Sequence, residues 1–216
     1  MPTSAKQERI ELLPPSRRTV VIPIVGMTEL ITHNWSHKAK QMMLDKQMGK
    51  ARLKKEPKDP EADYESSIYR FANNAESYGV PVTALKSAII SAARGFEGIT
   101  MTSLKQALFV EADGRTRDGI PLIKIEGKPH PREDMVRLET GVADIRYRAG
   151  FTEWKMEPRI TFNERMISMD SIFNLVREAG YCGIGEWRPT SKKTSGPFGT
   201  FAIDDARLKE LYKEAP

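Results

Sequence analysis

Apolar and polar residues alternate most clearly between residues 144 and 162. One run alternates through Ile145 and Tyr147, and a second alternates from Trp154 to Phe162. A period of two places one kind of side chain on each face of a β-strand. The pattern therefore predicts a pair of antiparallel strands, each with one apolar and one polar face. Four cations are expected on the polar face, away from the core: Arg146, Arg148, Lys155 and Arg159.

Residues 80–96 repeat apolar side chains with the spacing of a helix. Leu85 and Ile89 lie four residues apart on the stripe that should face the core. Lys86 and Arg94 fall on a neighbouring stripe, so their side chains should leave from the border of the apolar face. The segment is therefore expected to be a helix whose margin can present cations.

A second helix and two terminal strands complete the regular pattern. Ser168 is a suitable N-cap for the helix that follows it, and Gly180 is a suitable residue to end that helix. The β-branched segment 18–27 reads as a buried first strand, and residues 197–203, PFGTFAI, read as the last strand.

The order of these elements is strand, insertion, helix, strand pair, helix and strand. This order predicts an α+β fold with the ferredoxin-like arrangement β-α-β-β-α-β in a single domain spanning residues 1–216. Two insertions interrupt it, at residues 28–79 and 111–141. The first contains a basic helical segment, because residues 36–58 carry eight lysines or arginines, and the second should add β-hairpins.

Composition adds few restrictions. The chain has 216 residues and a net charge of +5, which permits an anionic partner without requiring one. Cys182 is the only cysteine, so no intrachain disulfide can form. The N-terminal residues lack the apolar stretch of a signal peptide, and no apolar run reaches membrane-spanning length. We therefore expect a soluble, cytoplasmic protein with no membrane partner.

The stretch from residue 180 to 201, GYCGIGEWRPTSKKTSGPFGTF, combines five glycines with large aromatic residues and cations. Gly183 and Gly185 would let backbone amides approach an anion, and Arg188, Lys192 and Lys193 would supply positive charge. A dinucleotide-binding fingerprint is excluded, because that motif needs a strand before it and a helix after it. A long connection whose glycines only satisfy turns remains the alternative.

His33 and His37 lie four residues apart, and on a helix this spacing could present two imidazoles to one metal ion. No cysteine or carboxylate cluster completes such a site, so we expect no metal and no cofactor. Two imidazoles could instead act as general acid and base in RNA cleavage. A polar loop after the first strand would explain the pair equally well.

An open cationic sheet face, a basic insertion and a cationic glycine-rich loop share one explanation, a bound nucleic-acid backbone. Two stretches also resemble the RAMP superfamily of CRISPR nucleic-acid-binding proteins. Residues 78–94, YGVPVTALKSAIISAAR, resemble its first-helix motif, and residues 183–201 resemble its C-terminal glycine-rich loop. The nearest resemblance is to the backbone subunits that coat guide RNA in CRISPR effector complexes.

This resemblance implies a ferredoxin-like palm, with the two insertions acting as fingers and thumb, and head-to-tail assembly along a strand. It implies phosphate contacts from Lys86 and from the loop residues Arg188, Lys192 and Lys193. The family members that cleave their target carry an aspartate in the loop after the first strand. Residues 28–38 contain none, so cleavage of a target strand is not expected.

The leading hypothesis is a non-enzymatic protein that binds single-stranded RNA or DNA and assembles as a homo-oligomer or as a repeated subunit of a ribonucleoprotein. Three alternatives remain open. The chain could be a phage or mobile-element single-stranded DNA-binding protein with the same fold, or an RNA-processing endonuclease that uses His33 or His37. It could also be a structural protein without a nucleic-acid role.

Overall fold

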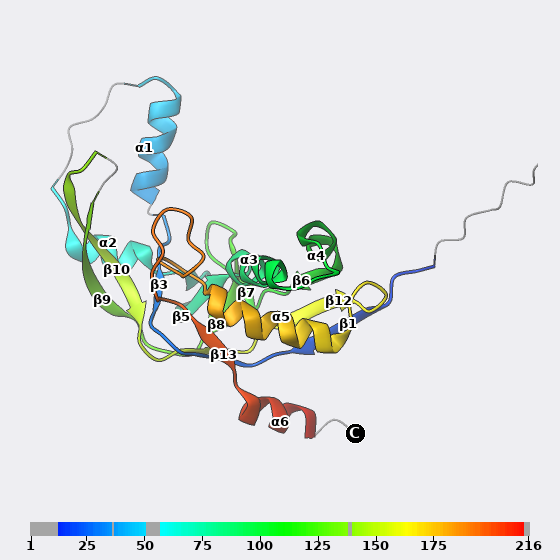
Figure 1. The fold of residues 1–216 in the computed structure, drawn as a ribbon. Coiled ribbons are helices and arrows are strands. Elements are labelled where there is room, and N and C mark those ends of the chain that lie inside the picture. The colour runs from blue at the N-terminus through cyan, green and yellow to red at the C-terminus, as the bar shows by residue number, and fades with distance from the viewer. Residues whose placement is uncertain (1–12, 36, 51–56, 138–139, 214–216) are drawn as a thin grey trace, which may run out of the picture.

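The computed structural model describes residues 13–35, 37–50, 57–137 and 140–213. They form a mixed α+β protein whose strands pair antiparallel throughout (Figure 1). The helices are α1 (His37–Gln47), α2 (Pro60–Ser67), α3 (Val82–Ala92), α4 (Met101–Ala107), α5 (Met169–Cys182) and α6 (Asp205–Lys213), with the 3-10 turn η1 (Ala93–Gly95) after α3. The strands are β1 (Arg17–Val21), β2 (Ile24–Gly26), β3 (Leu30–Thr32), β4 (Arg70–Phe71), β5 (Asn74–Pro81), β6 (Leu108–Val110), β7 (Gly114–Arg115), β8 (Pro121–Ile125), β9 (His130–Arg137), β10 (Ala143–Phe151), β11 (Lys155–Met156), β12 (Arg159–Asn163) and β13 (Phe201–Ile203).

Four runs of chain form the central sheet. The predicted first strand is present as β1 and β2, which are separated only by Ile22 and Pro23. β12 pairs with β1 on one side and β6 on the other, while β2 pairs with β11 and β13. The order across the sheet is therefore β13, the β1–β2 run, the β11–β12 run and β6. The first and last strands lie side by side although they are far apart in the sequence.

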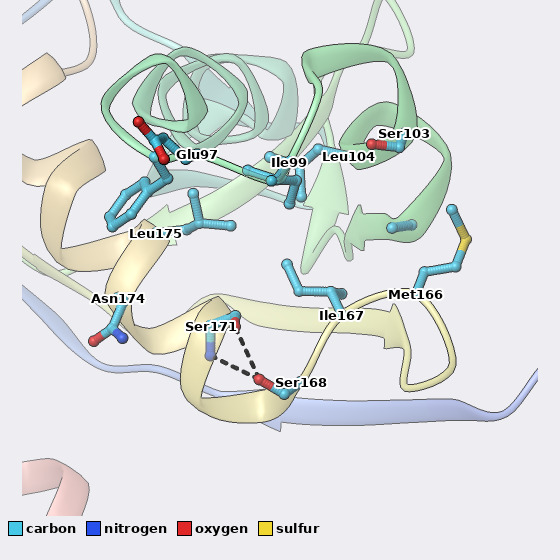
Figure 2. Close-up of a pocket in the computed structure, with 13 residues that line it drawn as sticks. Glu97, Ile99, Ser103, Leu104, Met166, Ile167, Ser168, Ser171, Asn174 and Leu175 are labelled. Atoms are coloured by element: carbon cyan, nitrogen blue, oxygen red, sulfur yellow. Dashed lines mark hydrogen bonds between the residues drawn. The ribbon is translucent and has the colours of Figure 1, made fainter.

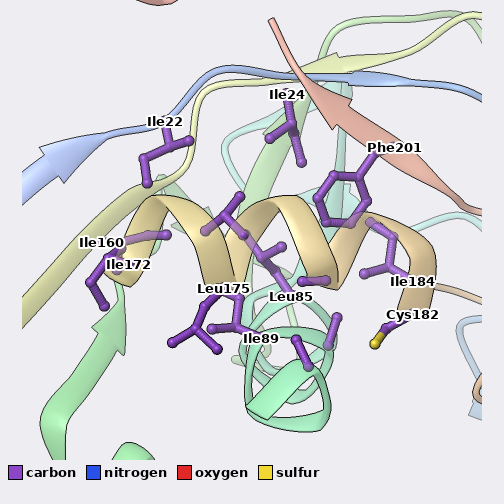
Figure 3. Close-up of a cluster of buried hydrophobic side chains, with 14 of the residues drawn as sticks. Ile22, Ile24, Leu85, Ile89, Ile160, Ile172, Leu175, Cys182, Ile184 and Phe201 are labelled. Carbon is purple, nitrogen blue, oxygen red and sulfur yellow. The ribbon is translucent and has the colours of Figure 1, made fainter. Parts of the chain in front are cut away.

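Helices α3 and α5 cover one face of this sheet and close the core (Figure 3). Leu85 and Ile89 of α3 are fully buried, as the helical spacing predicts, and Ile172 of α5 joins them. Apolar side chains at this spacing form one continuous stripe, so both helices bury that stripe against the sheet. The prediction of these two helices is confirmed.

The predicted end of α5 at Gly180 is wrong. The helix continues to Cys182, and Gly183 ends it with a φ of 70°. Gly180 lies inside the helix where α5 crosses the last strand, and a Cβ built there would lie 2.0 Å from the backbone oxygen of Phe201. The glycine is thus required by close packing against β13, and its local sequence gives no sign of this contact.

The predicted strand pair is also wrong. β10 pairs with β3 and with β9, whereas β12 belongs to the central sheet. The expectation that Arg148 faces solvent fails with it, since Arg148 is buried while Ile145 is exposed. The first half of β10 extends away from the body of the protein, and its second half is enclosed on both faces. Alternation along such a strand does not separate core from solvent.

The two insertions build the rest of the molecule. Residues 28–79 supply β3, α1, α2, β4 and most of β5, and residues 111–141 supply β7, β8 and β9. The basic segment 36–58 is helical over α1, and its residues 51–56 lie outside the described chain. α1 projects from the body beside the β9–β10 hairpin (Figure 1). No helix in the described ranges is long and apolar enough to cross a membrane.

Candidate nucleic-acid interface

The glycine-rich loop between α5 and β13 runs back along β3. Gly183 donates its backbone N–H to the carbonyl of Ala179, which completes the end of α5. Gly185 has a φ of 80°, and a Cβ built there would lie 2.5 Å from the carbonyl oxygen of Ile31. Glu186 then donates its backbone N–H to that carbonyl, at 3.0 Å. Glycine at these positions lets the loop lie directly against the strand.

Hydrogen bonds close the two ends of the loop on each other. Ile184 is fully buried and donates its backbone N–H to Gly199, at 3.0 Å. Gly199 in turn donates to the carbonyl of Glu29, at 2.8 Å. The base of the loop is thereby held against the first insertion, while Lys192 and Lys193 are exposed in its outer part.

Two rings and two guanidinium groups attach the loop to the β9–β10 hairpin. The rings of Trp187 and Phe198 lie 6.1 Å apart. The guanidinium of Arg148, from β10, lies 4.9 Å from the centre of the Trp187 ring, and that of Arg132, from β9, lies 4.9 Å from the Phe198 ring. Cation–π contacts of this kind favour the packed state. The aromatic residues therefore anchor the loop to the hairpin.

Arg148 lies in a small charged cluster beneath the loop. Its Nη2 atom is 3.6 Å from one carboxylate oxygen of Glu186, and Nδ1 of His33 is 3.4 Å from the other. The contact with His33, assisted by the charge of Arg148, lowers the pKa of Glu186. Burial lowers the pKa of Arg148, an effect that the Glu186 charge opposes. The Nη1 atom of Arg148 is buried and has no hydrogen-bond partner among the described residues.

A pocket of about 290 Å³ lies between this loop, β3 and the start of α3. Its polar lining comes from four separate segments: Thr32, His33, Tyr69, Thr83, Ser87, Glu186 and Arg188. Thr32 and Leu30 lie on the same face of β3 and both line the pocket. The Thr32 hydroxyl is buried and, within the described part of the chain, has no hydrogen-bond partner.

The start of α3 gives this pocket a positive end. The helix follows Pro81, which supplies no side-chain cap, so the first-turn amides near Thr83 have no side-chain acceptor at that position. Arg188 lies across the pocket and donates one hydrogen bond to the carbonyl of Gly185, at 2.9 Å. Helix amides, a guanidinium and hydroxyl groups together suit a phosphate oxygen. Glu186 opposes an anion, but Arg148 lies 3.6 Å from its carboxylate and offsets part of its charge.

Two of the predicted open-face cations lie in ion pairs away from the loop. Arg159 contacts the carboxylates of Glu111 and Asp113, each at 3.2 Å. Lys155 lies 3.7 Å from Asp204 and is largely exposed. Neither side chain lines the pocket. The period-two pattern correctly placed both residues outside the core but did not predict their acidic neighbours.

The structure also separates the remaining predicted cations. Lys86 places its ammonium 4.7 Å from the centre of the Phe109 ring and donates to the carbonyl of Lys105, on the α4 side of α3. Arg94 is exposed on η1, and Arg146 lies partly exposed on the β9–β10 hairpin. Arg148 thus lies against the loop at Trp187 and Glu186, while Lys86 and Arg94 lie elsewhere on the α3–η1 segment.

His33 and His37 do not share a helix, because α1 begins at His37 and His33 precedes it. The side chain of His37 lies outside the described part of the structure. Within the described ranges, no group of three or more histidine, cysteine or carboxylate side chains could hold a metal ion. His33 instead contacts Glu186, a residue of the glycine-rich loop that the sequence pattern does not single out beside the cations.

Sequence reasoning also missed Thr32, Thr83 and Ser87. Hydroxyl residues are common in loops and strands, and nothing in their local sequence signals a shared pocket. Comparison with known proteins adds no assignment: no protein-family model matches the chain, and no curated protein sequence matches it.

Proposed function

We propose that this chain binds the backbone of a single-stranded nucleic acid at the pocket between the glycine-rich loop and the start of α3. The observation that carries the proposal is a pocket lined by Arg188, the first turn of α3 and Thr32, whose buried hydroxyl has no hydrogen-bond partner among the described residues. A phosphate oxygen would accept hydrogen bonds from all three groups. Lys192 and Lys193, exposed farther along the same loop, would extend the contact to neighbouring phosphates.

The arrangement of the central sheet supports a ferredoxin-like palm of the RAMP type. In chain order, the four runs 17–26, 108–110, 155–163 and 201–203 are arranged as fourth, first, third and second across the sheet. The helices that follow the first and third runs, α3 and α5, pack against each other over one face. This is the connectivity expected of two β-α-β units in one sheet. A glycine-rich loop between the second helix and the last strand is also what the family resemblance implies, which supports this proposal.

The proposed protein is a binding protein, without an enzymatic role, that assembles head-to-tail along its strand. Backbone contacts carry little sequence information, so we expect binding without strong sequence preference. RNA and DNA oligonucleotides of matched length distinguish a guide-RNA-coating subunit from a phage or mobile-element DNA-binding protein. A structural protein without a nucleic-acid role would bind neither in a salt-sensitive way.

The decisive single substitution is Thr32→Val, which removes the hydroxyl and keeps the shape. Because the hydroxyl is buried without a partner, its removal should leave the free energy of unfolding unchanged or raise it. Loss of a hydrogen bond to a charged phosphate should weaken binding of a short oligonucleotide by about 1.5–3 kcal/mol, roughly 10- to 160-fold. Fluorescence anisotropy measures this. Unchanged affinity would remove the pocket from the binding site.

The loop cations are tested through the salt dependence of binding. Changing Arg188, Lys192 and Lys193 to Ala should reduce the log–log slope by about 2, since each phosphate contact on a single strand contributes about 0.7. The matched control changes three exposed lysines on other surfaces to Ala: Lys128, Lys209 and Lys213. Equal losses of slope in the two triple variants would mean that only net charge matters.

One observation favours a second candidate function, RNA cleavage. His33 and Glu186 are paired at 3.4 Å in the same pocket, an arrangement that can take a proton from a ribose 2′-hydroxyl. Labelled RNA incubated without metal separates the two functions. Site-specific cleavage that is lost in His33→Ala would identify an endonuclease, whereas intact RNA bound by both proteins supports the binding protein.

A further inference from the structure

Helix α1 presents apolar side chains that no other part of the described structure covers. Met42, Met43 and Leu44 in the helix, and Met48 directly after its end, are between 43% and 60% exposed. An ion pair between Lys40 and Asp118 ties the first turn of the helix to the body. An isolated helix of 11 residues is marginally stable in water, because most helical stability in proteins comes from tertiary packing. The helix therefore has the character of an element that is completed by a partner.

The exposed residues form a usable contact face. Leu44 and Met48 lie four positions apart, and Met43 lies on the adjoining row. Unbranched methionine side chains adapt to irregular apolar cavities, which suits them to contact surfaces. Lys46 borders one edge of this face, and Asp45 at the other edge is paired with Lys50 at 3.0 Å, which leaves the border basic overall.

A second pocket, of about 370 Å³, lies between α4 and the start of α5 (Figure 2). Leu104, Ile167 and Leu175 line its interior, while Phe96 and Met166 line it as exposed apolar residues, 40% and 46% exposed. The hydroxyl of Ser168 already accepts a hydrogen bond from the Ser171 amide, so that group does not require a polar ligand.

We propose that α1 of one copy inserts Met43, Leu44 and Met48 into the α4–α5 pocket of the next copy. The only charged residue that lines this pocket within the described chain is Glu97, which complements the basic border of α1. α1 and the α4–α5 pocket lie at opposite ends of the molecule (Figure 1), so one chain cannot satisfy its own contact. A contact between two different surfaces produces an open chain of subunits unless the rotation closes a ring.

The proposal takes only the head-to-tail order of subunits from the proposed function. The contact itself requires no nucleic acid. One short helix and one pocket form an interface at the small end of the range for specific complexes, so each contact is weak. Weak contacts between neighbours become effective when a strand holds the subunits together. The contact therefore provides cooperativity along a strand while leaving dilute protein largely monomeric.

The test uses two variants of the full chain without nucleic acid. Leu44→Asp with Met48→Asp disables the helix, and Ser171→Trp fills the pocket. Sedimentation velocity should show concentration-dependent association of the wild-type protein and at least tenfold weaker association of each variant alone. An equimolar mixture should form dimers and no larger species, because each variant retains one intact half of the contact. Association of either variant at the wild-type level, or a wild-type chain that stays monomeric at about 0.5 mM, overturns the proposal.

A crosslinking experiment covers the case in which a variant fails to fold. Leu44→Cys in one chain and Met166→Cys in another should form a disulfide on mixing under mild oxidation, whereas Leu44→Cys with Tyr212→Cys on α6 should not. Equal crosslinking of the two pairs contradicts the proposal. Binding of a short oligonucleotide is measured on the same variants and should be unchanged. If the wild-type chain does not bind the oligonucleotide, the proposed function is refuted, but the proposal of the subunit contact is unaffected.

Discussion

Gly185→Ala tests whether close contact with β3 positions the binding loop. The added Cβ would lie 2.5 Å from the carbonyl oxygen of Ile31 and 2.8 Å from Cδ1 of Leu30, so the loop must move away from the strand. Movement of the loop breaks the hydrogen bond from the Glu186 amide to the Ile31 carbonyl, which contributes about 1 kcal/mol. The shifts of backbone and side chains that make room for the methyl group cost roughly 1–3 kcal/mol more. The positive φ adds about 1–2 kcal/mol for any residue with a Cβ.

Gly119→Ala is the matched control. Gly119 has a φ of 84° and nothing within 4 Å of a built Cβ, so it carries the conformational cost without the clash. The difference between the two variants should therefore isolate the contact with β3, at about 2–4 kcal/mol. In a domain of this size that difference corresponds to roughly 4–16 °C in Tm.

Thermal unfolding followed by circular dichroism measures the difference, and anisotropy with a short oligonucleotide measures binding at a temperature where both variants are folded. We expect Gly185→Ala to bind more weakly, because a displaced loop carries Arg188 away from α3. Equal destabilisation by the two substitutions would refute the steric argument. A destabilised Gly185→Ala protein with unchanged affinity would show that the loop position does not matter for binding.

Three further predictions concern individual residues. Lys86→Glu should weaken oligonucleotide binding no more than Lys209→Glu does, because the Lys86 ammonium lies over Phe109 and not in the loop pocket. A much larger loss of affinity in Lys86→Glu would show that Lys86 contacts the nucleic acid. The pKa of Glu186 is lowered in the folded protein, so its contribution to stability is present above about pH 4.3 and is lost as the pH falls through the folded-state pKa. The difference in Tm between the wild type and Glu186→Gln should therefore shrink between about pH 6 and pH 3. A difference in Tm that stays constant over this range would contradict the prediction. Gly180→Ala should destabilise strongly although alanine favours helices, because its Cβ would lie 2.0 Å from a backbone oxygen of β13, and chemical denaturation showing a more stable variant would disprove the contact.

The amino-acid sequence was sufficient to predict the elements that obey a single local pattern. Helices α3 and α5 were predicted because their apolar residues recur with helical spacing, and Ser168 was identified as the N-cap that it proves to be. The first and last strands in the sequence, predicted at 18–27 and 197–203 and observed at 17–26 and 201–203, could be predicted because β-branched or aromatic runs bounded by turn residues have few alternatives. These features depend on neighbours within a few positions, which the sequence contains directly.

The tertiary structure decided which strands pair and which faces are covered. The alternation in β10 predicts a strand but cannot say that its partners are β3 and β9, so the burial of Arg148 could not be foreseen. The candidate pocket likewise joins Thr32, Thr83 and Glu186, which are separated by about 50 and 100 residues of chain. Periodicity shows how a segment divides its own side chains between two faces. To predict a site, one must also know which residues lie opposite each face, and only the folded chain determines this.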